Sequence, residues 1–154
     1  MSDLNLNSLY QELILDHYRK PRNKGELPEK TVEIHMANPV CGDEIRLQLQ
    51  IEGDKIVEAR HVGQGCSISQ AAVSMMTNLI KGRELSEAEG VAERFTAMMH
   101  GDEEAARDRS MGDLRALQGV SKFPVRIKCA LLAFDALQEA IKKERSERAP
   151  GTTD

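Results

Sequence analysis

Three cysteines are the residues of this chain best suited to metal binding or sulfur chemistry. Cys41 follows Asn-Pro-Val and precedes a glycine, Cys66 follows Gly-Gln-Gly, and Cys129 lies in a segment with helical apolar periodicity. Asp43 stands two residues after Cys41, and side chains at positions i and i+2 of an extended segment share a face. Zinc accepts thiolates and a carboxylate in tetrahedral coordination. Cys41, Asp43, Cys66 and Cys129 therefore form a candidate zinc site, and an iron–sulfur cluster could use the same thiolates.

The spacing of these residues leaves a second interpretation open. The chain has no C-x-x-C pair, and the wide separations match no zinc-ribbon pattern. Buried unreactive thiols are the alternative, above all for Cys129. Cys66 precedes an expected helix, and the N-terminus of a helix favours the thiolate form of a nearby cysteine. There is no P-loop and no complete G-x-G-x-x-G motif, so the sequence gives little support to nucleotide binding.

Composition and charge restrict the class of protein. The 154 residues carry a formal net charge of −4, so we expect no nucleic-acid partner. The N-terminus lacks the basic and apolar regions of a secretory signal, and no apolar run is long enough to cross a bilayer. We therefore expect a cytoplasmic protein with reduced thiols. The chain predicts a single domain over residues 1–148, with a flexible tail over residues 149–154.

The elements that would position these residues follow from periodicity. Strict alternation predicts a strand over residues 44–51, with two further strands beside it in an antiparallel sheet. Apolar spacing of three and four residues predicts the helices. The expected strands are 31–37, 44–51 and 56–62, and the expected helices are 7–19, 67–81, one opening at 86, 111–117 and 123–143. This order indicates an α+β fold, a three-stranded antiparallel sheet with helices packed on one face.

Several local features sharpen these expectations. In the strand 44–51 the odd-numbered apolar residues should face the core, and Gln48 should face outward. Ser67 to Gln70 fits a capping box, and Gly82 fits the position after a helix. We expect residues 101–109 to be charged and exposed. The remaining expectations are a packed or capping His17, His35 and His61 on the wet face of the sheet, a surface His100, Phe123 in the apolar stripe of the last helix, and core positions for Met75, Met76, Met98 and Met99.

Four segments resemble one protein family in the right order. They are Tyr10 to Asn23, Asn38 to Asp43, Gly63 to Ser69 and Val125 to Ala133, and the resemblance covers roughly residues 7–145. Their sequences are similar to the N-terminal helix and the three cysteine motifs of the IscU/SufU (NifU N-terminal) family. The resemblance implies the family's α+β fold and a role in iron–sulfur cluster assembly.

Departures from the family pattern favour its SufU branch. IscU scaffolds carry a histidine before the third cysteine and a Leu-Pro-Pro-Val-Lys motif, whereas this chain has Lys128 and the stretch Lys122 to Arg126. An inserted segment at about residues 82–119 is also typical of SufU. The resemblance implies a zinc-dependent sulfurtransferase that accepts persulfide sulfur from a SufS-type cysteine desulfurase and passes it towards downstream Fe–S assembly proteins. A scaffold on which Fe–S clusters assemble is the alternative, and a structural zinc domain is a third possibility.

The same resemblance assigns roles to individual residues. It implies that Cys41 accepts the sulfur and that Asp43, Cys66 and Cys129 remain as zinc ligands. Arg126 matches an arginine that the family places near the site, where it would contact the site or the partner. A direct role for Lys128 is a weaker expectation, because adjacent residues of a helix point to different faces.

Overall fold

The computed structural model describes the backbone of residues 2–148, and the expected tail at 149–154 lies outside the described residues. One helix precedes the three strands, and the remaining helices follow them. The elements are α1 (Ser2–Arg19), β1 (Val32–Asn38), β2 (Asp43–Glu52), β3 (Lys55–Gln64), α2 (Ser67–Ile80), α3 (Leu85–Met99), α4 (Glu103–Arg107), the 3₁₀ segment η1 (Arg109–Lys122) and α5 (Pro124–Arg148). None of the described helices combines the length and the apolar character needed to cross a bilayer.

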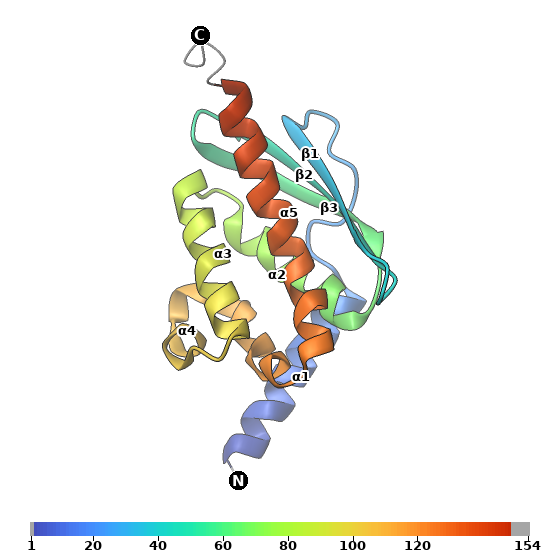
Figure 1. The fold of residues 1–154 in the computed structure, drawn as a ribbon, viewed down its shortest axis with the longest axis vertical. Coiled ribbons are helices and arrows are strands. Elements are labelled where there is room, and N and C mark those ends of the chain that lie inside the picture. Colours follow the sequence, from blue (N-terminus) through green and yellow to red (C-terminus); the bar gives the residue numbers. More distant parts are fainter. Residues whose placement is uncertain (1, 149–154) are drawn as a thin grey trace.

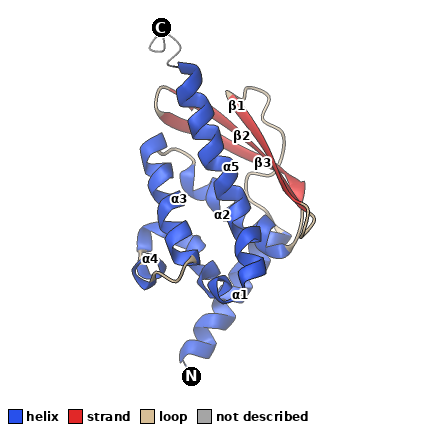
Figure 2. Ribbon diagram, viewed as in Figure 1, coloured by secondary structure: helices blue, strands red, loops and turns tan. Residues whose placement is uncertain are grey.

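The sheet is an antiparallel meander in the order β1-β2-β3. The helices lie together on one side of it, with α5 running across the sheet and α2 and α3 beside it (Figure 1, Figure 2). This is the α+β architecture that the sequence predicts. The core between the two layers is made of aliphatic side chains, methionines and one stacked pair of rings, Phe95 and Phe134. The four methionines expected in the core, Met75, Met76, Met98 and Met99, are all buried.

The alternation predicted for β2 is confirmed on its inner face and wrong at one position on its outer face. Ile45, Leu47 and Leu49 are buried against the helices. Gln48 was expected in solvent but is fully buried. The segment between α1 and β1 crosses the outer face here, and the Leu27 N–H donates to Gln48 Oε1 at 2.6 Å. Gln48 Nε2 in turn donates to Glu33, so the amide is satisfied inside this cover.

His61 lies on the core face of the sheet and not on the wet face as predicted, because of a β-bulge. Ile51 pairs with Ile56 while Gln50 pairs with Glu58, so one extra residue of β3 shifts the alternation. As a result His61 pairs with Leu47 on the core face instead of pointing to the wet face, and it is 1% exposed. Its Nε2 lies 2.9 Å from the Arg22 carbonyl oxygen. Burial lowers the pKa of His61 to about 4.

The other histidines follow expectation. His35 is exposed on β1, and His100 is exposed at the end of α3. His17 is packed inside the protein, with Nδ1 2.8 Å from Ser74 Oγ and Nε2 2.8 Å from Asp113 Oδ2. These two contacts tie α1 to α2 and to η1, so they hold part of the expected insertion against the rest of the protein.

The segment at residues 82–119 contains α3, α4 and most of η1. Residues 101–109 were expected to be charged and exposed, and most of them are exposed, but residues 103–107 also form the short helix α4, which was not predicted. The Asp102 carboxylate accepts the N–H of Glu104 at 2.9 Å and caps this helix, and Ala105 is buried. Phe123 was expected in the apolar stripe of α5, but it precedes that helix and is 60% exposed.

Candidate metal centre

The turn between β1 and β2 presents Cys41 at one end of the sheet. Asn38 and Asp43 form the last pair of the β1–β2 ladder, and the four residues between them make the turn. The Cys41 N–H donates to the Asn38 carbonyl at 3.2 Å, and Gly42 takes a positive φ of 71° that closes the turn back into β2. The Asn38 side chain donates to Cys41 Sγ at 3.6 Å. Cys41 is half-buried, beside a Val40 that is 82% exposed, so its sulfur lies at the edge of the protein.

Asp43 joins this turn to the start of α2. It is 1% exposed, and its Oδ1 accepts the Cys66 N–H at 2.8 Å. The predicted capping box at Ser67 is wrong, because Cys66 is the N-cap residue and makes no side-chain cap. A carboxylate from β2 takes over that function and satisfies one N–H at this helix end. Cys66 Sγ lies 3.9 Å from Asp43 Oδ2.

Gly65 makes this approach possible. Its φ is +153°, and a Cβ there would lie 2.7 Å from Ser69 Oγ and 3.0 Å from Asp43 Cα, and would collide with the Asp43 carboxylate. Any side chain would therefore push the Cys66 backbone away from Asp43. The glycine is required by the close contact between β2 and the N-terminus of α2.

Cys129 reaches the same point from α5. It is fully buried, and its Sγ lies 2.9 Å from Cys41 Sγ and 3.8 Å from the Val125 carbonyl oxygen. Burial raises the pKa of the Cys129 thiol, and the neighbouring Cys41 and Asp43 raise it further. Without a cation in the centre, Cys129 is therefore held as a protonated thiol. The interpretation of Cys129 as an isolated core thiol is not supported by this contact.

The donor atoms fit a small tetrahedral metal ion. Cys41, Asp43 and Cys129 each offer one ligand atom, and all three atoms lie within 4.8 Å of one another. Cys66 stands outside that group and adjoins it through Asp43, so its side chain has to turn inward to complete a set of four. Zinc with Zn–S bonds of about 2.3 Å places tetrahedral sulfur ligands about 3.8 Å apart. The Cys41 and Cys129 sulfurs, 2.9 Å apart, would have to separate by about 0.9 Å to bind one such ion.

The model of the NifU-like N-terminal domain matches residues 9–130.

The chain belongs to this family.

Among its relatives, the protein named zinc-dependent sulfurtransferase SufU from Bacillus subtilis is 49% identical over 140 residues, which cover 91% of this chain and 94% of that protein. The protein named iron–sulfur cluster assembly scaffold IscU from Streptococcus pyogenes is 42% identical over 149 residues, covering 97% and 91%. A crystal structure from Fervidobacterium islandicum, described as a scaffold protein for the SUF system, matches with a TM-score of 0.74 and 32% identity, covering 84% and 94%. The fold of this NifU-like N-terminal domain is thus confirmed independently.

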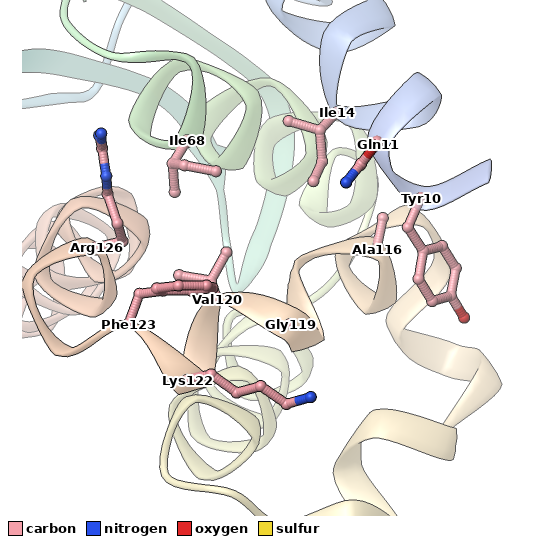
Figure 3. Close-up of a pocket in the computed structure, with 10 residues that line it drawn as sticks. All are labelled: Tyr10, Gln11, Ile14, Ile68, Ala116, Gly119, Val120, Lys122, Phe123 and Arg126. Atoms are coloured by element: carbon pink, nitrogen blue, oxygen red, sulfur yellow. The ribbon is translucent and has the colours of Figure 1, made fainter. Parts of the chain in front are cut away.

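Beside the centre, this NifU-like domain has a cleft of about 580 Å³ lined by α1, the start of α2, η1 and the start of α5. Figure 3 shows Ile68, Val120 and Phe123 around its apolar part, with Arg126 at one side and Lys122 at another. Within the described part of the chain, the Arg126 side chain makes no ion pair, and it is exposed. Ile68 follows Cys66 by two residues and Arg126 precedes Cys129 by three, so the cleft adjoins the donor cluster.

Lys128 is exposed on α5 and lines a separate hollow with Pro39 and Asp135. Lys128 is not one of the residues whose donor atoms cluster at the candidate metal centre. Asn38 and Gly65 were missed by the sequence reasoning. Two signals were available: an asparagine three residues before a cysteine in a turn, and a second glycine just before a helix. Both residue types form turns that bring backbone and side chains close together.

Proposed function

We propose that this protein is a zinc-dependent sulfurtransferase of iron–sulfur cluster assembly, which accepts persulfide sulfur from a SufS-type cysteine desulfurase. The observation that carries this proposal is the position of Cys41, a half-buried thiol on an exposed turn, in contact with a buried cluster of thiol and carboxylate donors. The relative named zinc-dependent sulfurtransferase SufU supports it. Because this chemistry depends on free thiols, we also propose a cytoplasmic location.

The proposed ligands are Cys41, Asp43, Cys66 and Cys129. Zinc bound there would hold the thiols deprotonated and less open to oxidation. Asp43 also positions the start of α2, because its carboxylate accepts the Cys66 N–H. Cys129 and Asp43 are buried, whereas Cys41 and Cys66 are both half-buried, and Cys41 lies on the turn beside the exposed Val40, where an external donor can reach it.

Sulfur transfer to Cys41 is a thiol–disulfide exchange. The Cys41 thiolate attacks the terminal sulfur of the persulfide on the partner's cysteine, a new S–S bond forms on Cys41, and the partner's cysteine leaves as a thiolate. No oxidant or reductant is consumed. The Asn38 amide, which donates to Cys41 Sγ at 3.6 Å, would stabilise negative charge on that sulfur.

The surface around Cys41 supports docking of a protein donor. Val40 is 82% exposed, Val125 is 63% exposed and Phe123 is 60% exposed, and exposed apolar side chains that gather into one patch mark a site of protein interaction. Arg126 adds an exposed cation that forms no ion pair within the described part of the chain. We propose that the desulfurase covers these residues and that Arg126 contacts the partner or the reacting sulfur.

A scaffold function is the second candidate. A cluster of cysteine donors also suits an Fe–S cluster, and the Streptococcus pyogenes relative is named a cluster assembly scaffold. In that case iron and sulfide would be assembled at Cys41, Cys66 and Cys129 and handed on to an apo-protein.

Metal analysis combined with a desulfurase assay tests the proposal. We expect one tightly bound zinc per chain and faster formation of alanine from cysteine when the protein is added to the desulfurase. The variant C41S should abolish the acceleration. The matched variant C66S also removes one thiol of the centre but should still carry labelled sulfur on Cys41.

Three results would contradict the proposal in different ways. Equal acceleration by C41S and the unmodified protein would exclude Cys41 as the acceptor. Tight zinc without any acceleration would indicate a structural zinc domain. A brown cluster formed on anaerobic reconstitution and transferred to an apo-protein, without acceleration of the desulfurase, would favour the scaffold.

A further inference from the structure

The three thiols of the centre are not equivalent, because two of them form a close pair. Cys41 Sγ and Cys129 Sγ are 2.9 Å apart. An S–S bond is about 2.05 Å long, so the two sulfurs have to approach by less than about 1 Å to bond. Cys66 instead contacts Asp43 through both its N–H and its sulfur, and it stands outside the close group of donors.

We propose that Cys129 is the resolving thiol for sulfur carried on Cys41: it displaces the terminal sulfur as sulfide and closes a Cys41–Cys129 disulfide. This inference rests on the proposed function, since it requires a persulfide on Cys41. It adds a second catalytic residue and a product, inorganic sulfide, to the acceptor role.

The step balances without an external reductant. Cys129 Sγ attacks the inner sulfur of the Cys41 persulfide, the bond between the two persulfide sulfurs breaks, and the terminal sulfur leaves. Cys129 has to lose its proton to attack as a thiolate, and the departing sulfur takes up a proton from solvent, so a persulfide and a thiol yield one disulfide and one H₂S. The terminal sulfur is reduced and the Cys129 sulfur is oxidised, while the Cys41 sulfur remains in an S–S bond throughout. An external dithiol then reduces the disulfide for the next cycle.

The burial of the two thiols suits this displacement. Exchange at sulfur requires the attacking, central and leaving sulfurs to lie in one line. Cys129 is fully buried in α5, whereas Cys41 is half-buried in a turn at the edge of the sheet. Cys129 can therefore attack from the interior while the terminal sulfur leaves towards solvent. Because Cys129 is also a proposed zinc ligand, we expect the persulfide to persist in the zinc-loaded protein and to be resolved in the metal-free protein.

The test uses the full-length protein and a small-molecule donor, glutathione persulfide, under anaerobic conditions. Zinc-loaded and chelator-treated samples are exposed to the donor, freed of excess reagent, and quenched with a thiol-alkylating agent. Released sulfide is measured by fluorescent trapping, and peptide mass spectrometry locates the persulfide and any disulfide. Circular dichroism verifies that each sample is folded.

We expect sulfide and a Cys41–Cys129 disulfide in equal amounts from the metal-free protein, and a retained persulfide on Cys41 in the zinc-loaded protein. C129A should lose the sulfide release and keep the persulfide, whereas C66A, which also loses one thiol, should still form the disulfide. Mapping the disulfide in the unmodified protein keeps the test valid even if C129A does not fold.

A Cys41–Cys66 disulfide, undiminished sulfide release from C129A, or a persulfide that stays on Cys41 in the metal-free protein would overturn the proposal, as would a Cys41 that the donor leaves unlabelled. These results are distinguishable from failure of the sulfurtransferase function. That failure would appear as no transfer from a desulfurase, a protein that the small-molecule test does not contain.

Discussion

Replacement of Asp43 should separate its structural contribution from its contribution to metal binding. Its Oδ1 accepts the Cys66 N–H at 2.8 Å in a site that is 1% exposed. A hydrogen bond to a charged group contributes about 1.5–3 kcal/mol, and a buried N–H left without an acceptor costs a similar amount. D43A should therefore lower the free energy of unfolding of the metal-free protein by about 2 kcal/mol. D43N keeps an oxygen acceptor, so its loss should be about 1 kcal/mol or less.

Both variants remove the carboxylate ligand, so both should weaken zinc binding to a similar extent. Urea unfolding in the presence of a chelator measures the stability of the metal-free protein, and competition with a chromophoric chelator measures zinc affinity. An unchanged stability of metal-free D43A would refute the structural argument. Zinc affinity that D43N retains in full would exclude the Asp43 carboxylate as a ligand.

Three further predictions concern the metal, one glycine and one histidine. Removing zinc should lower the melting temperature, because zinc at 100 times its dissociation constant adds about 2.7 kcal/mol of stability, and calorimetry with and without chelator measures this. G65A should destabilise the protein by about 1–3 kcal/mol through its collision with Asp43 and should weaken zinc binding, whereas G53A, a turn glycine with φ +64° and open space around it, should leave zinc affinity unchanged in the same competition assay. The pKa of His61 is lowered to about 4 from 6.5 by burial, so the unfolded chain takes up a proton below pH 6.5 that the folded protein does not. Stability should therefore be complete above pH 6.5 and fall by about 2 kcal/mol between pH 6.5 and 5 in urea titrations of the metal-free protein. In H61Q that acid-dependent loss should shrink, and an equal loss would show that other groups cause it.

The sequence was sufficient for the elements whose periodicity reflects one buried face. β2 alternates strictly and was placed within one residue at each end, and Gly82 takes the positive φ expected after α2. The class of fold followed from the order of these elements. These features are local, so the residues that define them are neighbours in the chain.

Expectations failed where distant segments meet. Gln48 is buried because the chain before β1 returns across the sheet, and His61 faces the core because a bulge shifts the alternation of β3. The helix α2 is capped by Asp43 and not by its own serine. None of these contacts leaves a periodic pattern in the sequence.

The sequence predicted which residues belong to the candidate site better than it predicted how they are arranged. The local contexts of the three cysteines, with Asp43 close to the first, indicated which residues belong together. The pairing of Cys41 with Cys129, and of Cys66 with Asp43, depends on how α5 crosses the end of the sheet. That crossing is fixed by the packing of the whole core, so spacing could not reveal it.

X-ray absorption spectroscopy at the zinc edge of the purified protein shows directly which atoms bind the metal. We expect one zinc per chain with three sulfur ligands at about 2.3 Å and one oxygen at about 2.0–2.2 Å. D43A should change the oxygen shell alone, and C129A should remove one sulfur. A zinc with fewer than three sulfur ligands, or a spectrum that D43A leaves unaltered, would contradict the proposed centre of Cys41, Asp43, Cys66 and Cys129.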